Sequence, residues 1–243
     1  DILGNSFSCS ASVLDFFEFF FFLGICLINI KKILHLLLMP YLVSILIPTL
    51  IERQNIYNKM ISDLYEQIKN HNLQDKVEII SICDNRNIPV VTKRNMLQKL
   101  SSGKYFTHLD DDDNFSDDYC KTVVDHIETL HIYQKKDPDC IGYNQLAKVQ
   151  GKRFIVKPNI KCGLSLTQTN GTTNYPEFYR YPWQYNLWNE KYKKVYRTKS
   201  DGSGAEDPNW LKKIQLEYPK NMTYINKVLH IYNFDDPSLS STQ

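Results

Sequence analysis

Six aspartates lie within nine residues of this 243-residue chain, in the segment LDDDDNFSDD at residues 109–118. Two carboxylates about 4 Å apart repel each other by roughly 1 kcal/mol in water and by roughly 4 kcal/mol at a protein-like dielectric constant. A run of charge is often only a solvated turn. Where a fold holds such a run together, the repulsion favours a bound cation.

The aspartate run does not fit the calcium loop of an EF-hand. Asp110, Asp112 and Asn114 match its first three side-chain ligands, but Phe115 stands where the turn needs glycine. Lys121 stands where a bidentate glutamate belongs. A cation held by one or two carboxylates keeps open coordination positions, and Mg²⁺ or Mn²⁺ in that state usually binds the phosphates of a substrate. The run therefore predicts Mg²⁺ or Mn²⁺ together with a diphosphate.

Three short apolar runs precede the aspartates, at residues 42–48, 77–83 and 104–109, and are typical of buried strands. Helical patterns separate them, so we expect an α/β fold, Rossmann-like, with a mostly parallel central sheet and helices on both faces. Ligands bind beyond the carboxyl ends of strands in such sheets. Those ends here carry Thr49, Asp84 and the aspartate run.

The helices are predicted from apolar residues that recur every three or four positions. The first helix presents one apolar stripe, made by Ile56, Met60, Leu64 and Ile68. The second is expected over residues 91–102, with Met96 and Leu100 facing inward. Ser116 is predicted to cap a third helix. Its buried face is expected to consist of Tyr119, Val123, Ile127 and Leu130.

Composition and charge limit the kinds of partner that the protein is expected to bind and indicate its location in the cell. The net charge is only +2, so no global field favours nucleic acid, and none is expected as a partner. The six cysteines are dispersed without a CxxC pair and are interpreted as reduced thiols. An Asn-x-Ser glycosylation pattern at Asn114 lies inside the aspartate run, where a sugar would cover the carboxylates. Both observations favour a cytoplasmic location.

Residues 1–38 form a hydrophobic extension ahead of the predicted domain at residues 39–243. Their uninterrupted apolar stretch, residues 19–28, is ten residues long, whereas a bilayer span needs about 20. Acidic residues precede that stretch where a signal peptide carries positive charge. Two interpretations stay open: a non-native upstream segment, or an anchor that associates with a membrane through residues 16–30.

Three segments taken together resemble the opening of glycosyltransferase family 2, whose members have the GT-A fold and use nucleotide-sugars. They are LVSILIPT, VEIISICD and TKRNMLQKLSSGKYFTHLDDDDNFSDDY, within residues 41–120. The family pattern is a strand ending in Pro-Thr, a strand ending in an acidic residue, Arg-Asn on a helix, Gly-x-Tyr and Leu-Asp-x-Asp-Asp. The family commonly continues its second strand with Asp-Asp-Gly-Ser. This chain has CDNRN at residues 83–87 instead, which leaves the nucleotide open.

The resemblance implies roles for the polar residues at the strand ends. Asp84 would contact the nucleotide base, with Lys93 or Arg94 near it. Asp110 and Asp112 would form the DxD pair, with Asp112 on the metal and Asp110 on the ribose or a metal-bound water. The expected nucleotide-binding set is Thr49, Asp84, Lys93, Arg94, Asp110 and Asp111. The expected metal set is Asp112, Asp110 and His230, the last from the segment VLHIYNF, which resembles the closing strand of the family.

Inverting sugar transfer needs a carboxylate that takes the proton of the acceptor hydroxyl, while a metal offsets the charge of the leaving diphosphate. Glu206-Asp207 resembles the Glu-Asp motif of the family, in which the aspartate is the base. Asp207 before Pro208 equally fits a helix N-cap. Trp183 and Tyr185, from an aromatic-rich segment, are candidates for an acceptor site or for the core.

The sequence thus predicts an inverting, metal-dependent glycosyltransferase that moves a sugar from a nucleotide diphosphate sugar to a glycan or other hydroxyl acceptor. One alternative is a nucleotidyltransferase with a similar sheet, although LIPTLIERQN lacks the glycine-rich phosphate loop expected there. The other is a non-catalytic binding or membrane-associated relative. Against it stand the intact Asp110, Asp112 and Asp207. Residues 140–175 match no known pattern.

Overall fold

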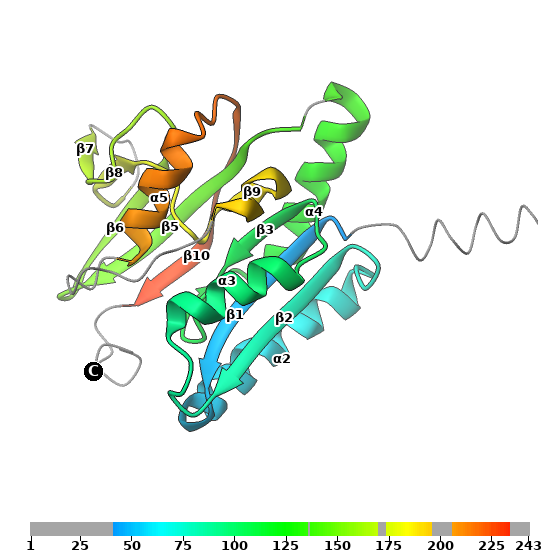
Figure 1. Cartoon of the computed structure of the whole chain (residues 1–243). Helices are drawn as coiled ribbons and strands as arrows, with labels where there is room; N and C mark the ends of the chain where they lie inside the picture. The colour runs from blue at the N-terminus through cyan, green and yellow to red at the C-terminus, as the bar shows by residue number, and fades with distance from the viewer. Residues whose placement is uncertain (1–40, 136, 170–173, 196–205, 234–243) are drawn as a thin grey trace, which may run out of the picture. The chain divides into compact units, whose positions relative to one another are not determined.

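The computed structural model describes residues 41–135, 137–169, 174–195 and 206–233, which form a ten-stranded sheet with helices packed on it (Figure 1). The predicted extension at residues 1–38, including the stretch proposed to meet a membrane, lies outside these residues. None of the helices in the described ranges combines the length and the apolar character needed to cross a bilayer.

The first half of the sheet alternates strands and helices as the sequence predicts. β1 pairs in parallel with β2 on one side and with β3 on the other. The elements are β1 (Val43–Leu50), a 3-10 turn (Ile51–Arg53), α2 (Gln54–Asn70), β2 (Val77–Asp84), α3 (Val90–Leu100) and β3 (Tyr105–His108). All three predicted strands are confirmed, and their carboxyl ends lie at one edge of the sheet.

The second half is mixed and joins the first through a short antiparallel strand. The order across the sheet is β2-β1-β3-β9-β5-β6-β8-β7, and β10 lies parallel to β5 and also pairs with β4. The elements are β4 (Asn114–Phe115), α4 (Tyr119–Thr129), a π-helical turn (Leu130–Gln134), β5 (Cys140–Val149), β6 (Lys152–Pro158), β7 (Thr167–Thr169), β8 (Glu177–Arg180), β9 (Leu187–Asn189), a 3-10 turn (Glu190–Lys194), α5 (Glu206–Leu216) and β10 (Met222–Asn233).

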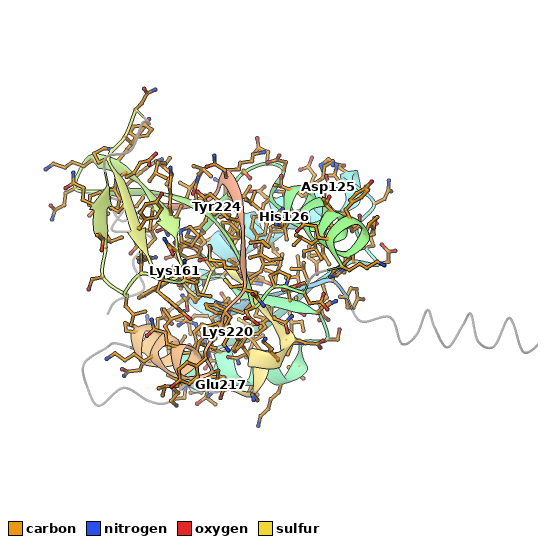
Figure 2. All side chains as sticks on the ribbon, turned by 90° about the horizontal axis from the view of Figure 1, so that it is seen from above. Asp125, His126, Lys161, Glu217, Lys220 and Tyr224 are labelled. Carbon is orange, nitrogen blue, oxygen red and sulfur yellow. The ribbon has the colours of Figure 1, made fainter. Side chains whose placement is uncertain are left out.

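Alternating side chains of β1 build a core on each face of the sheet, because successive residues of a strand point to opposite sides. Val43, Ile45 and Ile47 pack with α2 and α4, whereas Leu46 packs with α3 and α5. Seen from above, α4 with Asp125 and the end of α5 with Glu217 accordingly lie on different sides of the sheet (Figure 2). Helices on both faces are thus confirmed.

The predicted orientation of α3 is wrong. Met96 and Leu100 are 41% and 60% exposed. The side chains that α3 buries include Lys93, Arg94 and Leu97. Only Leu97 of these three is apolar. Lys93 and Arg94 point inward because their charged groups bind carboxylates and a backbone carbonyl in the interior.

The predicted cap of α4 is also wrong, although its buried face is confirmed. The helix begins at Tyr119, three residues after Ser116, with Asp118 at the N-cap position. The carbonyl of Ser116 accepts a hydrogen bond from the N–H of Tyr119, 3.0 Å away. Asp118 forms an ion pair with Lys227 of β10. The start of α4 thus combines local hydrogen bonds with an exposed ion pair to a distant strand.

Candidate active site

Asp84, at the end of β2, is held by α3. Lys93 Nζ donates to Asp84 Oδ1 at 2.6 Å and to the carbonyl of Thr49 at 2.8 Å. The N–H of Ile88 donates to the other carboxylate oxygen at 2.6 Å. The hydrogen bond from Lys93, and then that from Ile88, hold the pKa of Asp84 below its ordinary value. The end of β2 therefore carries an ionised carboxylate with a buried lysine beside it.

Asp111 binds one residue at the end of β1 and one in the turn that follows it. Thr49 Oγ1 donates to Asp111 Oδ2 at 2.7 Å, and Arg53 Nη2 donates to Oδ1 at 2.7 Å. The same Arg53 nitrogen lies 2.9 Å from Asp112 Oδ2. Arg53 was not among the predicted site residues. Its position could have indicated a role, because Arg53 is a cationic residue just beyond the end of β1, four positions after Thr49.

Arg94 joins two carboxylates that the sequence analysis assigned to different tasks. Its Nη2 donates to Asp110 Oδ1 at 2.5 Å, and its Nη1 donates to Asp207 Oδ1 at 2.9 Å. Asp207 lies in the first turn of α5, which begins at Glu206, so it is not a residue preceding the helix. Buried Trp210 anchors this helix on the sheet, and its Nε1 donates to the carbonyl of Val195 at 2.8 Å. The side chain of Glu206 lies outside what the structure describes.

His230, in the second half of β10, faces the aspartate run. Its Nε2 lies 2.8 Å from Asp113 Oδ1 but makes no hydrogen bond of normal geometry with any described residue. Its Nδ1 lies 2.9 Å from the side-chain amide of Gln145, the neighbouring residue on β5. The ring of Tyr185 stacks on it, with centroids 4.4 Å apart. The carboxylate nearest His230 is thus Asp113, whereas Asp112 points to Arg53.

A cavity of about 410 Å³ brings together some of the predicted catalytic, metal and acceptor residues. The loop after β8 is fixed beside β3, because Thr107 Oγ1 and the N–H of His108 donate to the carbonyls of Tyr185 and Gln184. This loop places its aromatic rings in the cavity wall. The predicted residues that line the cavity are Asp110, Asp207, His230, Trp183 and Tyr185. Asp84, Lys93, Thr49 and Asp112 lie outside this lining.

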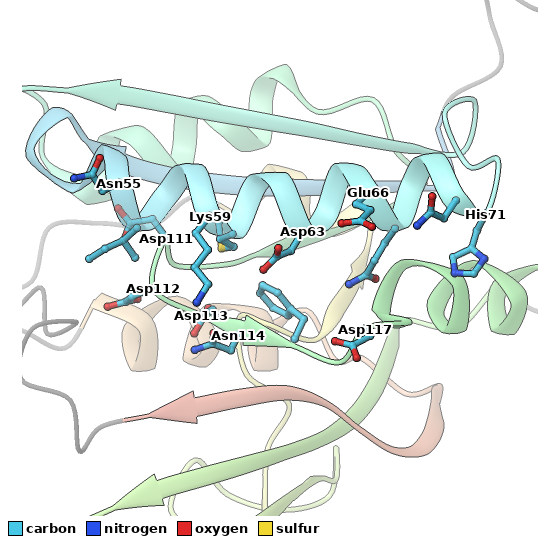
Figure 3. Close-up of a pocket in the computed structure, with 15 residues that line it drawn as sticks. Asn55, Lys59, Asp63, Glu66, His71, Asp111, Asp112, Asp113, Asn114 and Asp117 are labelled. Atoms are coloured by element: carbon cyan, nitrogen blue, oxygen red, sulfur yellow. The ribbon is translucent and has the colours of Figure 1, made fainter.

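A second hollow, of about 640 Å³, runs along α2 on the other side of the aspartate run (Figure 3). Asp111, Asp112 and Asp113 contribute to its wall, and Lys59 and Asp63 face them from α2. Asp113 lines both hollows. The aspartate run therefore contributes to the walls of both hollows: Asp110 lines the first, and Asp111 and Asp112 line the second.

Burial and repulsion between neighbouring carboxylates both raise pKa values within the run. Burial, and then the charges of Asp113 and Asp110, raise the pKa of Asp112 to about 7 although Arg53 opposes the shift. Burial also raises the pKa of Asp110, helped by Asp113 and Asp207 and opposed by Arg94. Both carboxylates would ionise more readily beside an added cation.

The ligand chemistry at this point fits Mg²⁺ or Mn²⁺, since both ions accept carboxylate oxygen and Mn²⁺ also accepts imidazole. The buried Nε2 of His230 facing Asp113 Oδ1 provides two such atoms. Within the described ranges, no group of three or more His, Cys, Asp or Glu side chains is placed so that it could hold a metal ion. The predicted trio of Asp110, Asp112 and His230 is thus not gathered around one point.

No protein-family model and no curated protein matches this chain. Among solved structures, residues 1–349 of S. aureus TarS in complex with UDP-GlcNAc match with a TM-score of 0.51 and 14% sequence identity, over 83% of this chain and 61% of that one. The UDP complex of the same fragment matches with a TM-score of 0.49 and 13% sequence identity, over 79% of this chain and 60% of that one. The catalytic domain of Drosophila β1,4-galactosyltransferase 7 in complex with xylobiose matches with a TM-score of 0.43 and 12% sequence identity, over 77% of this chain and 67% of that one.

The fold is that of the GT-A glycosyltransferases. This chain spans about 61% of the TarS fragment that it matches. Within the GT-A fold, the carboxyl ends of β1, β2 and β3 carry Thr49, Asp84 and the aspartate run, as the sequence predicts. Asp113, Gln145 and Arg180 also line the cavity and were not predicted. Asp113 was the only one with a signal, because it belongs to the Leu-Asp-x-Asp-Asp pattern.

Proposed function

We propose that this domain is a metal-dependent, inverting glycosyltransferase of the family 2 type, which moves a sugar from a nucleotide diphosphate sugar to an acceptor hydroxyl. The observation that carries the proposal is the bridge of Arg94 between Asp110 and Asp207. It brings the end of β3 and the first turn of α5, 97 positions apart, to one cavity.

The donor nucleotide is assigned to the ends of β1 and β2. Asp84, kept ionised by Lys93, offers acceptor oxygens to the donor groups of a base, and Thr49 lies beside it on the neighbouring strand. The matching TarS fragment was solved with UDP-GlcNAc, which supports a nucleotide-sugar as the donor. The departure at residues 83–87 from the family pattern leaves the base and the sugar open.

The residues that would hold Mg²⁺ or Mn²⁺ are His230 and Asp113. Asp110 lines the same cavity, whereas Asp112 lines the adjoining hollow and pairs with Arg53. A divalent ion there supplies positive charge to the leaving diphosphate. The chain itself fixes the imidazole: the amide of Gln145 meets Nδ1 and the ring of Tyr185 stacks on the face, so that Nε2 points at Asp113. The raised pKa of Asp112 adds a reason for a cation at this place.

Asp207 is the proposed base. Its side chain is 21% exposed and lines the cavity, and Arg94 holds Oδ1 in a fixed direction. A carboxylate fixed in this way accepts the proton of an acceptor hydroxyl as that oxygen attacks the anomeric carbon. Half-buried Trp183 supplies a ring face on which a sugar acceptor stacks. The ring of buried Tyr185 is already stacked on His230, so Tyr185 contributes to the cavity wall instead.

The proposal is tested by incubating the protein with Mn²⁺ and a panel of nucleotide diphosphate sugars, and by identifying the products. We expect release of the nucleoside diphosphate. Asp207→Asn should lower turnover by about 10²- to 10⁴-fold and leave nucleotide affinity unchanged. Asp125→Asn, at an exposed site on α4, is the matched control. Release of pyrophosphate would instead indicate nucleotidyl transfer, and full turnover in Asp207→Asn would remove that residue as the base.

A further inference from the structure

Arg180, the last residue of β8, lines the 410 Å³ cavity and is not used by the chemistry above. Its Nη2 donates to the hydroxyl of Tyr185 at 3.2 Å. Its Cζ lies 4.2 Å from the ring centre of Trp183 and 5.7 Å from that of Tyr185. Its Nε is buried and has no hydrogen-bond partner among the described residues. No carboxylate in the described part of the chain forms an ion pair with it.

This situation differs from that of the other buried or half-buried guanidinium groups. Arg53 and Arg94 each contact two carboxylates. Arg180 instead has a phenol and two aromatic faces around it, which hold the plane of the group without neutralising its charge. A buried N–H without a partner destabilises the folded protein. An arginine fork held in place matches the geometry of a carboxylate or phosphate, which accepts two parallel hydrogen bonds from it.

The position of Arg180 separates it from the proposed nucleotide site. Thr49, Asp84 and Lys93 lie at the ends of β1 and β2 and on α3, and they do not line this cavity. Tyr185 stands between Arg180 and His230: its hydroxyl accepts from the arginine and its ring stacks on the imidazole. The wall around Arg180 includes apolar side chains of β5 and β6. An anion bound by Arg180 would therefore lie on the aromatic side of the cavity, shielded by Tyr185 from the aspartate run.

We propose that Arg180 determines acceptor specificity by binding an anionic group, a phosphate or a carboxylate, that the acceptor carries near its reactive hydroxyl. The inference rests on the proposed function, because it takes Asp207 in the same cavity as the base for that hydroxyl. The diphosphate of the donor is the other source of a phosphate at this position.

Binding of matched probe pairs tests the proposal. Glycerol 3-phosphate is compared with glycerol, and methyl glucuronide with methyl glucoside, by calorimetry with and without UDP and Mn²⁺. The wild type should bind each anionic probe more tightly than its neutral partner by about tenfold to a hundredfold. Arg180→Gln should abolish the preference and leave UDP affinity unchanged. Arg153→Gln, an exposed arginine on β6 outside the cavity, should keep the preference.

Arg180→Lys keeps the positive charge and serves as a second variant in case Arg180→Gln does not fold. Arg180→Lys should retain part of the preference for anionic probes. Equal binding of anionic and neutral probes by the wild type would overturn the inference, as would an unchanged preference in Arg180→Gln. A loss of UDP affinity in Arg180→Gln would overturn it too, by assigning the arginine to the donor. Anion preference without any nucleotide binding would leave Arg180 as an anion site and would contradict the proposed glycosyltransferase function instead.

Discussion

Carboxylates at the two edges of the same sheet have opposite environments. At the amino end of β5, Asp139 is 4% exposed, and its Oδ2 accepts the N–H groups of Lys220 and Asn221 at 2.7 and 3.0 Å. Its Oδ1 forms an ion pair with Lys191. Burial alone would raise the pKa of Asp139, but the hydrogen bonds from Lys191, Asn221 and Lys220 lower it below the ordinary value.

At the carboxyl end of β3 the balance is reversed. Burial, and then the neighbouring carboxylates, raise the pKa of Asp112 to about 7, and only the shared Arg53 opposes this shift. Burial acts on both carboxylates, and the difference between the two edges lies in their neighbours: three donors surround Asp139, whereas Asp112 has other carboxylates and one shared arginine. A carboxylate with three donors stabilises the fold, whereas a crowded one at a strand end destabilises the fold when it is ionised.

Removing the well-satisfied carboxylate should give the largest change in stability. Asp139→Ala leaves Lys191 without its partner and the N–H groups of Lys220 and Asn221 without an acceptor. We expect the free energy of unfolding to fall by about 3 kcal/mol, measured by urea denaturation at pH 7. An unchanged free energy would mean that the join between β5 and β10 does not depend on this residue.

Replacing the crowded carboxylate, Asp112, should raise the free energy of unfolding instead of lowering it. Since the pKa of Asp112 is higher in the folded protein than in the unfolded chain, folding stability should fall as pH rises from about 4 to 7. Asp112→Asn should remove this loss and stabilise the metal-free protein at pH 8 by about 2 kcal/mol. Asp139, with a lowered pKa, contributes stability above pH 4 that is lost as the pH falls below that value. The measurement is urea denaturation from pH 3 to 8 in the presence of a chelator, and an equal pH slope in wild type and Asp112→Asn would refute it.

An exposed carboxylate should change stability least. Asp125 pairs with Lys121 one helical turn away, and both side chains are about half exposed, at 53% and 47%. Exposed pairs of this kind contribute about 0.3–0.5 kcal/mol. Asp125→Asn should therefore shift the free energy of unfolding by no more than that in the same denaturation experiment. A larger loss would show that carboxylate burial is a poor guide in this protein.

The elements that local pattern defines were predictable from the sequence. The apolar runs of β1, β2 and β3 and the stripe of Met60, Leu64 and Ile68 on α2 arise from periods of two and of three to four residues within short windows. The inward face of α3 was not predictable in this way. Burial of Lys93 and Arg94 depends on Asp84, Asp110 and Asp207, and the last of these is 113 residues away from Arg94.

The choice among neighbouring aspartates depends on long-range pairing as well. The pattern Leu-Asp-x-Asp-Asp predicts a pair at Asp110 and Asp112 but does not say which carboxylate meets the imidazole. That choice is made by the register of β10 against β4 and β5, which places His230 beside Phe115 and Gln145. Arg180 was missed although Trp183 and Tyr185 are only three and five residues away in the chain, because the sequence does not show that both rings turn toward the guanidinium group.

The central claim is that the aspartate run binds a divalent cation together with a nucleoside diphosphate. Calorimetric titration of UDP, GDP and CDP into the wild type, with Mn²⁺ and then with a chelator, tests it most directly. We predict that at least one nucleotide binds only with Mn²⁺, and that Asp112→Asn and Asp113→Asn each weaken this binding by about tenfold or more, while Asp125→Asn does not. Nucleotide binding that is equally tight without metal, or that survives both substitutions unchanged, would contradict the account.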